Sequence, residues 1–233
     1  MIRAIEEQER AGEPVRGIIL QPINKHDMKQ ASGDFYKQVV RAAQKRGVAV
    51  IVDEAHCCFG ATGELWAFRN WLLNEDEIPD FVVFGGRAQA TGYFTNFELR
   101  GSQNQGDCDL RKLIQFATIW QEISRQNTLK LVGDASTVLK VELNRASGEL
   151  PWLVHNLRGE GSLLAFDCMS DEIRDSFVRY LELNGVRVGS LGVRSIVLRP
   201  ALTLSAFQVG LFTNLVHRYD RTLSKDIGAG LYS

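Results

Sequence analysis

Residues 48–94 read VAVIVDEAHCCFGATGELWAFRNWLLNEDEIPDFVVFGGRAQATGYF, and this stretch decides the fold class. Two runs within it, 48–52 and 81–84, are short and apolar, and turn-forming residues surround both. Such runs, rich in β-branched and aromatic side chains, are typical of buried strands. An earlier apolar run, 17–20, is joined to the first by a segment whose apolar residues (Phe35, Val39, Val40 and Ala43) recur at helical spacing. This strand–helix–strand order predicts a parallel sheet.

Acidic residues follow the first of these strands directly. Asp53 and Glu54 come at its carboxyl end, which is where an open α/β sheet usually presents its chemistry. The letters Asp-Glu-Ala-His at 53–56 also spell a helicase box. The chain contains no Gly-x-x-x-x-Gly-Lys-Ser/Thr loop to bind phosphates, so we dismiss that interpretation.

Composition excludes several classes of protein. The chain has 233 residues and a formal net charge of -1, which offers no electrostatic case for nucleic acid or an anionic membrane. No apolar run approaches the roughly 20 residues of a membrane span. His56, Cys57 and Cys58 are adjacent and cannot easily converge on one tetrahedral ion, so we expect no metal site. Four cysteines in this pattern favour buried thiols in a reducing compartment.

Several motifs occur in one order along the chain: VDE at 52–54, GATGELWA at 60–67, FGGRAQATGYF at 84–94, RGEG at 158–161 and Arg199-Pro200. In this order they resemble the class III pyridoxal-phosphate aminotransferases, and most closely the 4-aminobutyrate branch, over roughly residues 15–215. The resemblance implies an α/β fold: part of a fold type I large domain with a mostly parallel sheet, followed by a smaller α/β domain.

We predict three regions on this basis. Residues 1–125 form the partial large domain, 126–149 a bridging helix, and 150–233 the small domain. The small domain is expected to begin with a helix over 150–157 and to contain a strand at 186–188.

The resemblance also indicates a missing group. In the family, the strand that corresponds to 81–84 leads into the lysine that binds the cofactor covalently. Here Gly86 or Arg87 stands in that place, and no lysine lies between Lys45 and Lys112. Arginine keeps its proton and is not a nucleophile. From this we expect no catalytic residue and no bound pyridoxal phosphate, although Arg87 could also be an ordinary surface loop residue.

Five further positions are vestigial site residues by the same resemblance. Gln21 stands where the family has a glutamate near the substrate amine. Asp53 matches the aspartate that pairs with the pyridine nitrogen, or it is a residue bonded into the sheet end. His56 lies where the branch has a glutamine beside the cofactor ring, and Thr118 matches a threonine that reaches the phosphate of a neighbouring subunit. Arg199 matches the arginine that binds the substrate carboxylate, or it is a structural arginine at a strand end.

The functional hypothesis is a catalytically inactive aminotransferase-like subunit of a larger multiprotein complex. The resemblance begins midway through the family's large domain, so other subunits, a chain that supplies the N-terminal half, or a second copy would cover the open sheet edges. A mitochondrial location follows from the resemblance alone. The alternatives are one half of a split 4-aminobutyrate-type aminotransferase, or a non-catalytic regulator that binds pyridoxal phosphate or a carboxylate.

Overall fold

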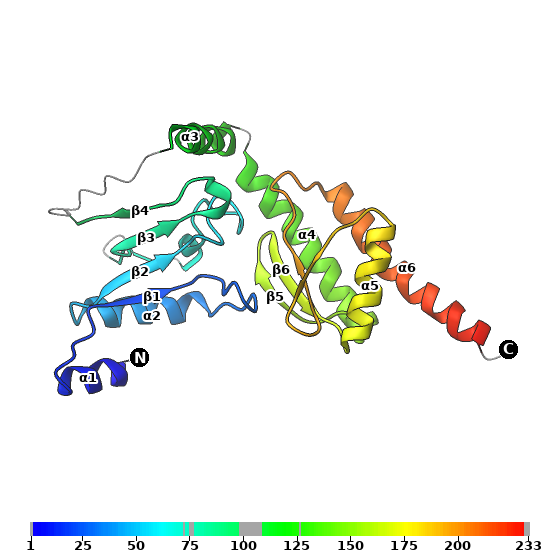
Figure 1. The fold of residues 1–233 in the computed structure, drawn as a ribbon, viewed down its shortest axis with the longest axis horizontal. Coiled ribbons are helices and arrows are strands. Elements are labelled where there is room, and N and C mark those ends of the chain that lie inside the picture. Colours follow the sequence, from blue (N-terminus) through cyan, green and yellow to red (C-terminus); the bar gives the residue numbers. More distant parts are fainter. Residues whose placement is uncertain (1, 72, 75–76, 98–108, 126, 231–233) are drawn as a thin grey trace. The chain divides into compact units, whose positions relative to one another are not determined.

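The computed structural model describes residues 2–71, 73–74, 77–97, 109–125 and 127–230, with side chains described through residue 219. Figure 1 shows the course of the chain. It forms two compact units. The first unit contains residues 1–24 and 30–127, and the second contains 25–29 and 128–233.

The first unit is built on a four-stranded sheet. Its elements are α1 (Ile2–Arg10), β1 (Gly17–Leu20), α2 (Gly33–Gln44), β2 (Ala49–Asp53), η1 (Ala67–Trp71), β3 (Phe81–Phe84), η2 (Gly86–Ala88), β4 (Gly92–Thr95) and α3 (Leu110–Arg125). The strand order is β1-β2-β3-β4, with the first two pairings parallel and the third antiparallel. The predicted α/β fold with a mostly parallel sheet is therefore confirmed.

Helix α2 packs beside this sheet with a slightly different face from the one predicted. Ser32 caps the helix, because its side chain accepts a hydrogen bond from the Phe35 amide. Phe35 itself is 53% exposed, whereas Tyr36 is buried and stacks on Trp71 with ring centroids 4.1 Å apart. The Tyr36 hydroxyl donates to the carbonyl of Gln21 at 2.8 Å. The prediction of Phe35 as a core residue was wrong, and the neighbouring tyrosine joins the helix to the end of β1.

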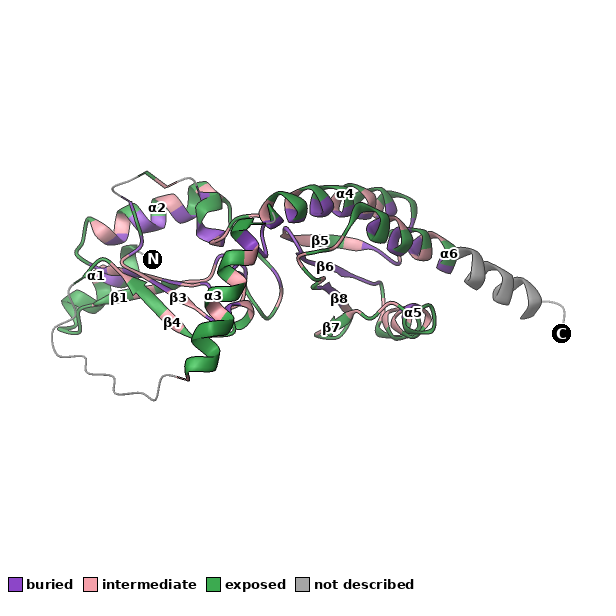
Figure 2. Cartoon of the chain, turned by 90° about the horizontal axis from the view of Figure 1, so that it is seen from above, coloured by how far each residue is buried: buried purple, intermediate pink, exposed green. Residues whose placement is uncertain are grey.

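The second unit packs helices on an antiparallel sheet. Its elements are α4 (Thr128–Glu149), β5 (His155–Glu160), β6 (Leu163–Asp167), α5 (Asp171–Leu183), β7 (Gly189–Leu191), β8 (Ser195–Leu198) and α6 (Ala206–Gly230). The strand order is β5-β6-β8-β7. Figure 2 shows the buried residues along β6 and β8 and on the inner side of α4. Their apolar side chains form one core with α5 and α6.

Two local predictions in this unit were wrong. A helix was expected over 150–157, but α4 ends at Glu149 and residues 155–157 open β5, which pairs with β6. A strand was expected over 186–188, but β7 begins at Gly189. In both places pairing with the next strand along the chain, β5 with β6 and β7 with β8, sets the strand and overrides the local preference.

A buried ion pair holds residues 25–29 to the second unit. The Arg158 guanidinium donates to Asp167 at 2.8 Å and to the carbonyl of Asp27 at 2.5 Å. Ser195 and Asn156 also donate to the Asp167 carboxylate, at 2.6 and 2.7 Å. Burial of Asp167 opposes its ionisation, but these three donors together hold its pKa below the usual value. The carboxylate is therefore charged and fully bonded at neutral pH.

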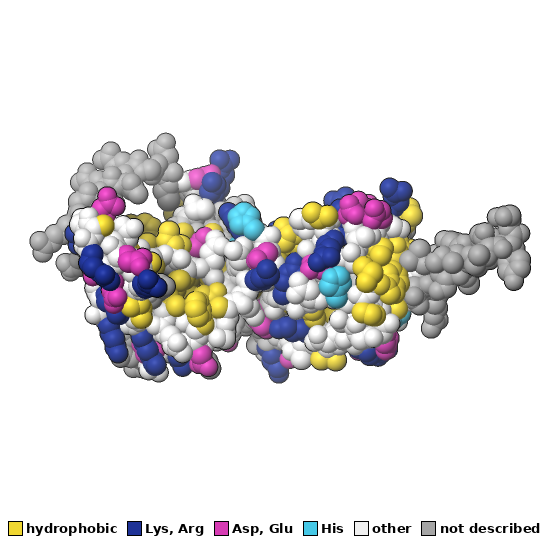
Figure 3. Space-filling view, turned by 90° about the horizontal axis from the view of Figure 1, so that it is seen from below, with side chains coloured by type: hydrophobic (Ala, Val, Ile, Leu, Met, Phe, Trp, Pro, Cys, Tyr) yellow, Lys and Arg dark blue, Asp and Glu magenta, His cyan; other side chains and the backbone are white. Residues whose placement is uncertain are grey.

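The surface is mixed in character. Figure 3 shows acidic and basic side chains interspersed over both units, in agreement with the formal net charge of -1. Within the residues that the structure describes, no helix is both long and apolar enough to cross a membrane.

Candidate functional site

The carboxyl ends of three neighbouring parallel strands meet at one edge of the first sheet. Gln21 follows β1, Asp53 ends β2, and the turn 85–88 follows β3. Since β1 pairs with β2 and β2 with β3, these residues come from adjacent positions along that edge. This is the edge at which open α/β sheets bind their ligands.

Gln21 and Asp53 are in direct contact. The Gln21 side-chain amide donates to Asp53 Oδ2 at 2.8 Å, and the Ala55 amide donates to Asp53 Oδ1 at 3.0 Å. Each carboxylate oxygen therefore has one donor and keeps a further lone pair for a ligand. Asp53 is half-buried, so its carboxylate is oriented by the protein and still reachable from outside.

The turn after β3 is tightly packed on the loop after β2. Gly86 adopts φ +52°, and a Cβ placed there would lie 2.6 Å from the carbonyl oxygen of Ala55. The Gly85 carbonyl accepts a hydrogen bond from the Cys58 thiol at 3.4 Å. Position 86 therefore excludes a side chain, and Arg87 is the first residue of the turn that carries one. Of the two residues that the resemblance places at the family's lysine, Gly86 and Arg87, only Arg87 therefore carries a side chain.

Four more ionisable residues lie in the loop after β2. Glu54 is fully buried and accepts a hydrogen bond from the Phe68 amide at 2.8 Å. Burial raises its pKa to about 7. Burial likewise raises the pKa of the Cys57 and Cys58 thiols, so these cysteines are inert core residues. His56 is half-buried in the same loop.

Thr118, the residue that resembles the family's phosphate-binding threonine, lies on α3. Its hydroxyl donates to the carbonyl of Ile114 at 2.8 Å, within its own helix, and the residue is exposed. Two residues earlier, Phe116 packs against Phe59 and Phe84, with ring centroids 5.2 and 5.5 Å apart. The segment is thus held by its phenylalanine, and the threonine is turned to the surface.

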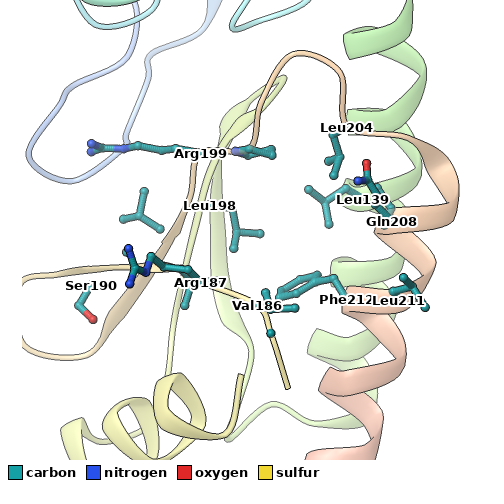
Figure 4. Close-up of a pocket in the computed structure, with 16 residues that line it drawn as sticks. Leu139, Val186, Arg187, Ser190, Leu198, Arg199, Leu204, Gln208, Leu211 and Phe212 are labelled. Carbon is teal, nitrogen blue, oxygen red and sulfur yellow. The ribbon is translucent and has the colours of Figure 1, made fainter. Parts of the chain in front are cut away.

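Arg199 belongs to the second unit. It follows β8, is exposed, and lines a cavity of about 670 Å³ together with Arg187 (Figure 4). Among the described residues it forms no ion pair. Sequence reasoning missed Arg187.

The described residues contain no cluster of three or more potential metal ligands. At the carboxyl edge of the first sheet, the chain supplies the half-buried Asp53 carboxylate and the Gln21 side-chain amide.

Comparison with known proteins identifies the family. The sequence profile described as aminotransferase class III matches residues 1–219. The chain belongs to the class III aminotransferase family.

Relatives within this family are named 4-aminobutyrate aminotransferases. The one from Dictyostelium discoideum is 32% identical over 91% of this chain and 43% of its own length. The one from Schizosaccharomyces pombe is 34% identical over 81% of this chain and 41% of its own length. The rat relative, 31% identical over 86% of this chain and 41% of its own length, is named as mitochondrial. The chain thus spans less than half the length of these class III relatives, some of which carry a mitochondrial label and others none.

Solved structures show the same fold. A lysine aminotransferase from M. tuberculosis superimposes with a TM-score of 0.81, at 20% identity, over 93% of this chain and 52% of that one. An ornithine aminotransferase from Plasmodium yoelii gives a TM-score of 0.77 at 18% identity, over 93% and 59%. The fold is therefore that of part of a class III aminotransferase.

Two expectations from the sequence were wrong. We expected a protein that is not an enzyme, but the relatives are named as aminotransferases, and neither the match nor the structure shows a loss of activity. We also expected no cofactor, but the class III family is pyridoxal-phosphate-dependent. The inference failed because one substituted position, Arg87, was taken to decide the property of a whole site.

The residues at this edge fit the cofactor in part. The Asp53 carboxylate has a free lone pair for a protonated ring nitrogen. The turn after β3 offers a guanidinium and no primary amine, because residues 46–111 contain no lysine. Asp53 thus fits the ring nitrogen of the cofactor, whereas residues 46–111 supply no amine to bind the cofactor covalently.

Proposed function

We propose that this chain is the C-terminal part of a pyridoxal-phosphate-dependent, 4-aminobutyrate-type aminotransferase. The observation that carries the proposal is the Asp53 carboxylate at the end of β2, oriented by Gln21 at 2.8 Å, in a chain of the class III family. Bound pyridoxal phosphate supplies the aldehyde through which an amino group passes between substrates.

Asp53 would hold the proton of the cofactor's ring nitrogen. Gln21 and the Ala55 amide each donate to one of its oxygens, and these bonds keep the carboxylate in one orientation. A carboxylate beside a ring nitrogen favours the charged, protonated ring. Arg199 would bind the substrate carboxylate, because its fork of donors matches two carboxylate oxygens.

The remainder of the large domain would come from an N-terminal part, on this or another polypeptide. In the described sheet β1 pairs on one side only, with β2, and its Ile19 is 69% exposed. A further strand beside β1 would satisfy its open backbone groups and cover this side chain. Because the family's lysine follows the strand that corresponds to β3, an N-terminal part would not supply it, and the anchoring amine would come from another lysine of this chain, outside residues 46–111.

A mitochondrial location is proposed with this function. It rests on the mitochondrial label of several 4-aminobutyrate aminotransferases among the relatives.

The test is reconstitution. The chain is coexpressed with the N-terminal part of the Dictyostelium relative, and amino transfer from 4-aminobutyrate to a 2-oxo acid is measured with added pyridoxal phosphate. We expect turnover, and we expect Asp53→Asn to lower it about a hundredfold, as loss of an oriented charge at a reacting group does. Asp134→Asn removes an exposed carboxylate of α4 and should leave turnover unchanged.

Borohydride reduction followed by peptide mass spectrometry locates the anchoring amine. A cofactor adduct on a lysine outside 46–111, in an active assembly, supports the proposal. An assembly that binds the cofactor and shows no turnover contradicts it.

A further inference from the structure

The residue that donates to the Asp53 carboxylate is itself held from a helix. Gln21 Nε2 lies 2.8 Å from Asp53 Oδ2, and the bonded register of β1 with β2 ends one residue before Gln21, at Leu20 and Val52. The sheet alone therefore does not fix the peptide unit of Gln21. Its carbonyl accepts a hydrogen bond of 2.8 Å from the hydroxyl of Tyr36 on α2.

Tyr36 is in turn closely packed. It is 7% exposed, and its ring stacks on Trp71 with an interplanar angle of 10°. The start of the same helix approaches the same tryptophan, because a Cβ added to Gly33 would lie 3.4 Å from the Trp71 Cα. The Tyr36 hydroxyl also lies 3.3 Å from the Pro22 carbonyl. A ring packed in this way has little rotamer freedom, so its hydroxyl is a fixed donor for the Gln21 carbonyl.

The same packing leads back to the residue beside Asp53. Trp71 contacts the ring of Phe68, with centroids 6.3 Å apart, and both residues belong to η1. The Phe68 amide donates to the buried carboxyl of Glu54 at 2.8 Å. The contacts therefore close a ring that runs through Asp53, Gln21, Tyr36, Trp71, Phe68 and Glu54. Both carboxyl-bearing residues at the end of β2 are thus tied to α2 and η1.

We propose that Tyr36 is a positioning residue for Asp53. It fixes the backbone of Gln21, so that Gln21 Nε2 reaches Asp53 Oδ2 and the carboxylate keeps one orientation. Such support matters because the groups of a site must be held within about 0.5 Å of their working geometry. The inference rests on the proposed function for the role of Asp53. It deepens that function by assigning the site a residue from a helix, which touches neither Asp53 nor the cofactor.

The first measurement uses the full chain without cofactor and follows the side-chain amide signal of Gln21 by NMR. Loss of the signal in Gln21→Ala assigns it, and Asp53→Ala shows its position when the amide is released. Tyr36→Phe keeps the ring and removes only the hydroxyl, and we expect it to move the signal towards the Asp53→Ala position. Tyr93→Phe makes the same change at an exposed tyrosine of β4 and should leave the signal unchanged.

An unmoved Gln21 signal in Tyr36→Phe overturns the proposal. A Tyr36→Phe chain that does not fold also overturns it, because the hydroxyl would then serve the fold as a whole.

The second measurement gives the dissociation constant of pyridoxal phosphate in the reconstituted assembly. Tyr36→Phe should weaken cofactor binding about three- to tenfold, the range expected for one neutral hydrogen bond. In a Gln21→Ala background the same change should weaken binding no further, because the residue through which Tyr36 acts is gone. Equal weakening in both backgrounds overturns the proposal. An assembly that binds no cofactor contradicts the proposed function, and the Gln21 signal of the chain alone then decides the role of Tyr36.

Discussion

Replacement of Gly86 by alanine should destabilise the first unit for two separable reasons. Gly86 has φ +52°, which costs a residue with a Cβ roughly 1–2 kcal/mol. The new Cβ would also lie 2.6 Å from the Ala55 carbonyl oxygen, a distance that forces backbone to move. Such overpacking costs about 1–3 kcal/mol. Together these effects predict a loss of about 2–5 kcal/mol in the free energy of unfolding.

Gly47→Ala is the matched control. Gly47 lies in the same unit at φ +65°, and a Cβ there would meet no atom within 4 Å. This variant should therefore show the conformational cost alone, about 1–2 kcal/mol. Urea unfolding of the wild type and both variants gives the two free energies, and their difference measures the contact with Ala55.

Equal losses for Gly86→Ala and Gly47→Ala would refute the steric argument. Position 86 would then tolerate a side chain despite its approach to Ala55. A larger loss at position 86 supports the steric restriction.

Two further predictions concern buried carboxyl groups. Asp167→Asn leaves Arg158 without its charged partner at a site where the Asp167 and Arg158 side chains are 9% and 12% exposed. We therefore expect the free energy of unfolding in urea to fall by about 3–5 kcal/mol. A decrease no larger than that of the exposed Asp134→Asn would contradict this expectation. Because the folded-state pKa of Asp167 is lowered, its stabilising effect should be present at neutral pH and disappear as the pH falls below about 3.8. Glu54 has the opposite sign: its folded-state pKa is raised from 4.5 to about 7, so stability should fall as the pH rises through this interval. Glu54→Gln should remove this pH dependence of stability in thermal melts between pH 4.5 and 7. The exposed Glu64→Gln should retain it. An unchanged pH dependence in Glu54→Gln would show that another group titrates.

The sequence by itself determined two strands of the first sheet and the family. Runs 17–20 and 81–84 appear in the structure with the predicted bounds, because a short apolar run between turn residues has few other ways to be buried. The order of motifs from VDE to Arg199-Pro200 was enough to indicate the class III family, which the profile match confirms. The apolar runs are local features, and the motifs are recognised by their order along the chain, so neither requires knowledge of the folded structure.

The tertiary structure decided which side chains face one another. Residues 155–157 became strand because β6 was available to pair with them, and Tyr36 replaced Phe35 in the core because it reaches both Trp71 and the end of β1. The contact of Gln21 with Asp53 depends on which strands are neighbours in the sheet.

The restriction at Gly86 depends on the carbonyl of Ala55, in the loop after another strand, approaching its backbone. Strands such as 17–20 and 81–84 are predicted by their own apolar residues. The contacts of Gln21 with Asp53 and of Gly86 with Ala55 join segments that are distant in sequence, and only the folded chain defines them.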